Sequence, residues 1–152
     1  MTVLTRILVP LDGSALAESV LPTVGMLARC MGAEVVLLHI IEEHAPQKVH
    51  GQPHLRTTED AISYIEEIKG RLGHDIAVSS HVHGTGEQDV AVSVAEHTGE
   101  LRADMVALCT HGRGDFRRAV SGSIAQQVLR KVDIPVLLVR PQMQSPTKLN
   151  TV

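Results

Sequence analysis

The sequence has 152 residues, a length typical of one domain, and 43% of them are hydrophobic. Its formal net charge is −3, and Tyr64 and Phe116 are its only aromatic residues. This composition argues against nucleic-acid binding through a basic surface or through bases stacked on aromatic side chains. No apolar stretch approaches the roughly 20 residues that span a bilayer, and no signal peptide is evident. We therefore expect a cytoplasmic protein without membrane association.

Five short apolar runs rich in valine, isoleucine and leucine predict β-strands. They span residues 6–11, 34–41, 76–83, 104–109 and 134–139. Between these runs, apolar side chains recur at helical spacing and predict helices over residues 16–31, 62–72, 90–94 and 124–132. Alternating strands and helices predict an α/β fold, with an open, doubly wound parallel sheet and helices on both of its faces.

The character of each run predicts its place in the sheet. Runs that are apolar without interruption, as in residues 7–9, 35–38 and 105–108, suit central strands that are buried on both faces. The run 76–83 alternates apolar and polar residues, and the run 134–139 contains Pro135, so both are expected at the edges.

Three further segments interrupt or follow these patterns. Pro22 predicts a kink, or a helix that restarts there. Residues 42–56 contain two prolines, a glycine and no periodicity, which predicts a surface loop or lid. Residues 142–152 are expected to form a flexible tail, after a single domain that spans residues 1–141.

The end of the first predicted strand is a candidate ligand site. Open parallel sheets bind ligands beyond the carboxyl ends of their strands, where the connecting helices diverge. The first strand runs into Asp12, whose carboxylate suits ribose hydroxyl groups or a divalent cation. Asp12 or Ser14 could equally cap the following helix, and the sequence does not separate these interpretations.

The segment after the fourth predicted strand has the features of a phosphate-binding loop. Residues 110–131 carry five basic side chains against the single Asp115, a local charge of +4. Gly112 and Gly122 allow the backbone to approach a ligand closely, and Ser123 stands where the next helix should begin. Because the N–H groups at a helix N-terminus attract anions, a phosphate cradle is favoured over an ordinary loop.

This segment also resembles a known family. The run Thr110-His111-Gly112, followed after nine residues by Gly122-Ser123, resembles the signature G-x-x-G-(nine residues)-G-[ST] of the nucleotide-binding universal stress proteins. The segments RILVPLDGS, EVVLLHII and IPVLLVRP are similar to that family too, so that the resemblance covers residues 4–141. It implies a Rossmann-like sheet in the order 3-2-1-4-5, a homodimer, and bound ATP or AMP without a characterised metabolic reaction.

The resemblance further implies a set of site residues. Adenine would lie among Pro10, Ile40 and Leu108, and the ribose near Asp12, which could also reach a Mg²⁺ ion bound to the nucleotide.

The phosphates would lie against the loop and the helix N-terminus that follows it. The residues expected there are His111, Gly112, Arg113, Gly122, Ser123 and the N–H group of Ile124. Cys109 belongs to the predicted site as well, and it stands where the family signature has its first glycine.

Three functions stay open. The chain could be a regulator in the stress response that binds ATP or AMP, a dimeric interaction module that binds no nucleotide, with Cys109 marking the loss, or a slow ATP hydrolase. No nucleophile elbow or HExxH motif is present, and no paired carboxylates have an evident acid/base assignment, which favours the regulator over a turnover enzyme. The apolar edge run 134–139 is the predicted dimer contact.

Two residue types invite other hypotheses. His81 and His83 share one face of a strand, but no third ligand is placed by spacing, so we expect exposed edge residues and no metal site. Cys30 is expected to be a small core residue of the first helix. Cys109 lies near basic residues that can lower the pKa of a thiol, which makes it a candidate sensor of oxidants.

Overall fold

The computed structural model describes residues 3–42, 48–49, 52–53, 55–84, 88–110 and 124–141. Its main sheet has five parallel strands in the order β5-β2-β1-β6-β7. They are β1 (Arg6–Leu11), β2 (Glu34–Ile41), β5 (Val78–Gly84), β6 (Met105–Cys109) and β7 (Val136–Val139). Numbered within this sheet alone, the strands have the order 3-2-1-4-5, which confirms the predicted α/β architecture.

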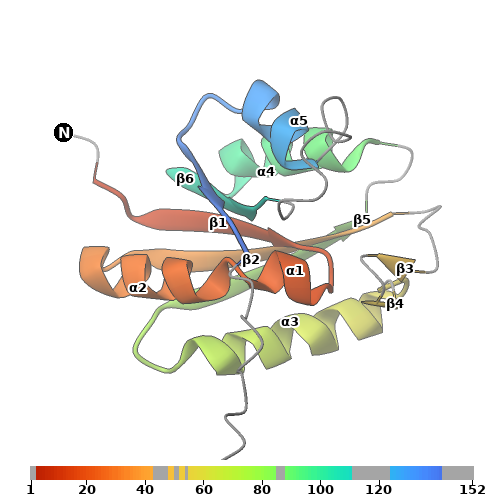
Figure 1. Ribbon diagram of the computed structural model, residues 1–152, viewed down its shortest axis with the longest axis horizontal. Helices are drawn as coiled ribbons and strands as arrows, with labels where there is room; N and C mark the ends of the chain where they lie inside the picture. Colours follow the sequence, from red (N-terminus) through yellow and green to blue (C-terminus); the bar gives the residue numbers. More distant parts are fainter. Residues whose placement is uncertain are drawn as a thin grey trace, which may run out of the picture.

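Helices cover both faces of the sheet. They are α1 (Ala15–Glu18), α2 (Leu21–Met31), α3 (Thr58–Leu72), α4 (Val90–Glu100) and α5 (Ile124–Lys131). Figure 1 shows α2 and α3 on one face, and α4 and α5 on the other. Each pair of helices therefore closes its own hydrophobic core against the sheet.

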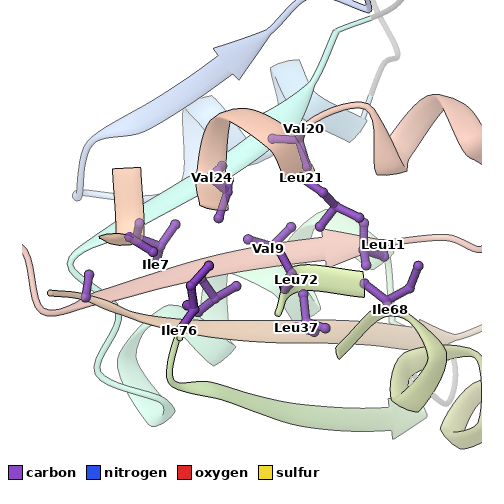
Figure 2. Close-up of a cluster of buried hydrophobic side chains, with 14 of the residues drawn as sticks. Ile7, Val9, Leu11, Val20, Leu21, Val24, Leu37, Ile68, Leu72 and Ile76 are labelled. Carbon is purple, nitrogen blue, oxygen red and sulfur yellow. The ribbon is translucent and has the colours of Figure 1, made fainter. Parts of the chain in front are cut away.

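Successive residues of β1 enter different cores, because side chains of a strand alternate between its faces. Ile7 and Val9 are fully buried with α2 and α3, in the core that Figure 2 shows. Leu8 is fully buried on the opposite side, where it packs in the core of α4 and α5. This double burial explains why the central strands appear in the sequence as continuous apolar runs.

The predicted ranking of the strands is confirmed. β1, β2 and β6 are interior strands, whereas β5 and β7 lie at the two edges. Pro135 directly precedes β7, so its missing N–H group costs the strand no hydrogen bond inside the ladder.

The first predicted helix is divided, and Pro22 explains where. α1 ends at Glu18, and α2 restarts at Leu21 with Pro22 in its first turn. Proline is tolerated in that position because the first N–H groups of a helix have no partner within it. α2 ends at Gly32, whose φ of 64° is left-handed and favours glycine.

Cys30 is exposed, so the prediction that it packs in the core was wrong. The buried residues of α2 are Leu21, Val24, Gly25 and Ala28. This stripe follows helical spacing, and Cys30 lies two positions beyond Ala28, which turns its side chain away from the stripe.

Within the predicted loop 42–56, the structure describes a short antiparallel pairing of β3 (Lys48–Val49) with β4 (Gln52–Pro53). The sequence analysis did not predict this pairing. Residues 43–47, 50–51 and 54 lie outside the described residues, as does the predicted tail 142–152. In the part of the chain that the structure describes, no helix has the length and apolar character needed to cross a membrane.

One carboxylate ties the beginnings of β1 and β6 together. Oδ2 of Asp104 accepts hydrogen bonds from the Thr5 backbone N–H group (2.8 Å), the Thr5 hydroxyl group (2.7 Å) and the Arg6 backbone N–H group (2.9 Å). These bonds hold the pKa of Asp104 below its ordinary value, with the Thr5 side chain as the largest cause. Asp104 therefore fixes β1 against β6 at the end of the sheet opposite the candidate site.

Candidate functional site

A cavity opens at the carboxyl ends of β1, β2 and β6. β1 is followed by helices on one face of the sheet and β6 by α5 on the other, so the connections diverge between these two neighbouring strands. This is the place where open α/β sheets bind ligands. The residues that line this carboxyl-end cavity are Pro10, Leu11, Asp12, Leu16, Ala17, Leu38, Ile40, Glu42, Val90, Val94, Leu108, Cys109, Ile124 and Ala125.

The structure brings together every predicted site residue that it describes. Those residues are Pro10, Asp12, Ile40, Leu108, Cys109 and Ile124, and all of them line the carboxyl-end cavity. The other predicted residues, which are His111, Gly112, Arg113, Gly122 and Ser123, lie outside the described residues.

The wall of the cavity is aliphatic. Ile40 and Leu108 are 6% exposed, and Leu38 and Val94 are fully buried behind them. The lining residues given above include no aromatic side chain, so a flat apolar ligand would lie between branched aliphatic groups.

The sequence analysis missed Leu38, Val90 and Val94, which form part of this wall. Val90 and Val94 of α4 are four residues apart on one helical face, and Leu38 lies two residues before Ile40 on the same face of β2. These spacings place the side chains together, but only the packing of α4 over β2 shows that they line the cavity.

The sequence left open whether Asp12 and Ser14 contact a ligand or cap the following helix, and the structure answers this for Ser14. The Ser14 hydroxyl oxygen accepts a hydrogen bond from the backbone N–H group of Ala17 (3.1 Å), so Ser14 is the N-cap of α1. Asp12 Oδ1 accepts hydrogen bonds from the Ser14 N–H group (2.9 Å) and hydroxyl group (2.6 Å). Ser14 is thus a buried structural residue, while Asp12 supports the cap and also lines the cavity.

Two carboxylates, Asp12 and Glu42, lie on the lining of the cavity. Carboxylate oxygens accept hydrogen bonds from sugar hydroxyl groups and are the preferred ligands of Mg²⁺. The cavity therefore combines an aliphatic wall with oxygen acceptors.

The described surroundings of Cys109 raise the pKa of its thiol. Its Sγ lies 2.9 Å from the Ser19 hydroxyl oxygen. Burial raises the pKa of the thiol, the hydrogen bond with Ser19 opposes this, and the nearby Asp12 carboxylate raises it further. The net shift is upward because desolvation is the largest cause among the described residues, which runs against a sensor of oxidants; Arg113, Arg117 and Arg118, the nearby basic residues of that hypothesis, lie outside the described residues.

The sequence matches the universal stress protein family over residues 4–140. The chain is a member of the universal stress protein family. Universal stress protein MJ0577 of Methanocaldococcus jannaschii is 27% identical over 157 residues, which cover 89% of this chain and 94% of that protein. A solved structure of MJ0577 has a TM-score of 0.71 at 24% identity, and the match covers 95% of this chain and 100% of the other.

Two other structures of the universal stress protein family were solved with adenine nucleotides. A universal stress protein in complex with cAMP has a TM-score of 0.67 and 18% identity, over 93% of this chain and 100% of the other. A universal stress protein of Archaeoglobus fulgidus in complex with dAMP has a TM-score of 0.60 and 22% identity, over 90% and 98%. At these identities, the similarity shows a shared fold.

Proposed function

We propose that this universal stress protein binds ATP or AMP in the carboxyl-end cavity and acts as a nucleotide-dependent regulator of the stress response in the cytoplasm. The observation that carries the proposal is the position of the cavity, at the carboxyl ends of β1, β2 and β6 where the connecting helices diverge. The cAMP and dAMP complexes of two relatives with the same fold support it.

The lining of the cavity suits the parts of an adenine nucleotide. Pro10, Ile40 and Leu108 offer aliphatic contacts to both faces of a purine ring. Asp12 offers an acceptor for the ribose hydroxyl groups and, with the phosphates, a ligand for Mg²⁺. The phosphates then lie toward Ile124, where α5 begins, because the first N–H groups of a helix favour negative charge.

The residues of the loop before α5 complete this proposal as phosphate contacts. They are His111, Gly112, Arg113, Gly122 and Ser123, which precede Ile124 in the sequence. Cys109 lies at the start of this loop, on the lining of the cavity, and its half-buried thiol would contact the ligand.

We also propose that the protein is a homodimer that pairs through β7. This strand is at an edge of the sheet, and the side chain of Leu138 is 41% exposed on it. An apolar edge strand exposes backbone donors and acceptors to a second chain, and a two-fold axis would pair β7 with itself.

Isothermal titration calorimetry with ATP and AMP tests the nucleotide proposal. Ala125 lines the cavity from α5, so the substitution Ala125→Leu should fill part of it. Overpacking of this kind costs about 1–3 kcal/mol, which corresponds to a loss of affinity of about fivefold to a hundredfold or more. Leucine is a good helix former, so the helix itself should tolerate the change.

Ala95→Leu is the matched control, because Ala95 is half-buried in α4 and is absent from the lining of the cavity. This variant should keep the affinity of the unmodified protein. The absence of binding heat at millimolar ATP and AMP, or equal affinities for the Ala125→Leu variant and the unmodified protein, would contradict the proposal. The first of these outcomes would favour the interaction module that binds no nucleotide.

A further inference from the structure

Three histidine side chains form a cluster on the α4 face of the sheet. His81 and His83 belong to β5, and His97 belongs to α4. The ring centroid of His97 lies 4.9 Å from that of His81 and 4.7 Å from that of His83. One nitrogen atom of each ring lies within 4.8 Å of the corresponding atoms of the other two. Both residues lie on the edge strand β5 and His83 is exposed, as predicted, but His81 is half-buried, and a third imidazole that spacing did not place lies against them.

The fold explains why these residues meet. His81 and His83 are two residues apart on β5, so their side chains lie on the same face of the strand. Their register partners on β2 are Leu38 and Ile40, both of which belong to the core under α4 and α5. His97 lies three residues after Val94 on the buried stripe of α4, so it points at this same face of the sheet.

His97 is oriented as a metal ligand would be. Its Nδ1 atom is 2.6 Å from the backbone carbonyl oxygen of Ser93, and because a carbonyl only accepts, Nδ1 carries the proton. In the neutral imidazole, Nε2 then has a free lone pair. In metalloproteins, a hydrogen bond of this kind from the other ring nitrogen fixes the tautomer and orientation of a histidine ligand.

Among the described residues, the Nε2 atom of His97 also has no hydrogen-bond partner. His97 is 2% exposed, and this nitrogen is buried with no donor within hydrogen-bond distance among the described residues. The nearest carboxylate oxygen is Oε2 of Glu100 at 3.8 Å. A buried acceptor without a partner is unfavourable, and a metal ion at this position would satisfy it.

We propose that His81, His83 and His97 bind one Zn²⁺ ion through their imidazole nitrogens, with Glu100 or water in the fourth tetrahedral position. In tetrahedral coordination with a Zn–N distance of about 2.0 Å, two nitrogens lie about 3.3 Å apart, so the three nitrogens, which lie within 4.8 Å of one another, must approach each other by at most about 1.5 Å. Rotation of the half-buried and exposed rings of β5 supplies this movement.

The surroundings of His81 favour its neutral imidazole, which is the form that binds metals. Burial lowers the pKa of His81, and the neighbouring His97 and His83 lower it further, against an opposing effect of Glu100. Imidazole nitrogen is a good ligand for Zn²⁺ and a poor one for Mg²⁺, which prefers oxygen atoms. The site is therefore distinct from any Mg²⁺ ion that a nucleotide carries into the carboxyl-end cavity, and it does not depend on the proposed nucleotide binding.

A competition titration with Zn²⁺ and a chromophoric chelator tests the site on the nucleotide-free protein. The exposed thiol of Cys30 is removed by Cys30→Ser in all samples, since it could bind Zn²⁺ itself. We expect the parent protein to bind one Zn²⁺ ion per chain with high affinity. The His83→Asn and His81→Asn variants should each bind this ion much more weakly. Changes to groups that only orient a metal ligand already weaken binding by 10–100-fold, so loss of a direct ligand should weaken it at least about a hundredfold.

His74→Asn is the matched control, because His74 is exposed and is not a member of the cluster. It should bind Zn²⁺ as tightly as the parent protein does, and millimolar Mg²⁺ should not displace the metal. His83 is exposed, so His83→Asn should fold normally, and circular dichroism verifies this before the titration. Zn²⁺ affinities of His81→Asn and His83→Asn within about threefold of the parent would overturn the proposal, because either result would place any bound metal elsewhere.

Discussion

Replacement of Asp104 should weaken the junction between β1 and β6 in a way that depends on pH. Its Oδ2 atom accepts three hydrogen bonds, from the N–H and hydroxyl groups of Thr5 and the N–H group of Arg6. A hydrogen bond to a charged group contributes about 1.5–3 kcal/mol, but solvent screening reduces this at the exposed Thr5. We expect Asp104→Ala to lower the free energy of unfolding by about 2 kcal/mol in total at neutral pH.

The pH dependence of this loss follows from the pKa of Asp104, which is lower in the folded protein than in the unfolded chain, chiefly because of the bond from the Thr5 side chain. A carboxylate with a lowered pKa stabilises the fold fully above its unfolded pKa, and this contribution is lost as the pH falls through the folded value. The difference between the parent protein and Asp104→Ala should therefore be constant at neutral pH and shrink in acid.

Urea denaturation measured by circular dichroism gives these free energies, since the chain has no tryptophan to report on unfolding by fluorescence. Asp104→Asn is the control: it keeps an acceptor oxygen without the charge, so its stability should be intermediate and its loss less dependent on pH. Equal stability of Asp104→Ala and the parent at neutral pH would refute the reasoning. A loss for Asp104→Ala that stays the same in acid would refute the assignment of the stabilisation to the charged carboxylate.

Two further predictions concern the thiols and the edge strand. In a Cys30→Ser variant, the half-buried Cys109 should react with a disulfide reagent more slowly than the exposed Cys30 does in Cys109→Ser, because partial burial raises the pKa of Cys109. Equal rates would contradict the burial argument. In sedimentation experiments at micromolar concentration, the parent protein should be a dimer and Leu138→Lys should shift it toward the monomer, because Leu138 is 41% exposed on the proposed contact strand. A monomeric parent protein would rule out that contact.

The sheet was predictable from the sequence because strands that are buried on both faces have continuous apolar runs. Continuous apolar runs such as 35–38 occur where both sides of a strand are covered, and the alternation in 76–83 occurs at an edge. The division of the first helix was predictable from Pro22 for an equally local reason. The pairing of β3 with β4 involves two residues on each side, which is too short to produce a periodic pattern.

The site was predictable only in part, because its members come from separate elements. Asp12 was found from its position at the end of a strand and Leu108 from the family resemblance, but the contribution of Val94 depends on how α4 packs over the sheet. His97 follows His83 by fourteen residues, and no spacing rule links a strand to a helix that crosses it. A histidine three residues after Val94, on a buried helical stripe, was the available signal. Cysteine is a residue type that is often buried, but the angular position of Cys30 on α2 lies away from the buried stripe that contains Val24 and Ala28.

The strand order has a consequence for the synthesis of this protein. β1 is synthesised before the other four strands of the main sheet, yet it lies between β2 and β6, and β6 follows it by about a hundred residues. Until β6 is made, the backbone of β1 can pair with β2 on one side only. The N–H and C=O groups of its other edge are then available to other nascent chains. Closure of this gap requires a contact of long sequence range, which slows folding. The nascent chain is therefore most prone to aggregation between the completion of β2 and the arrival of Met105–Cys109.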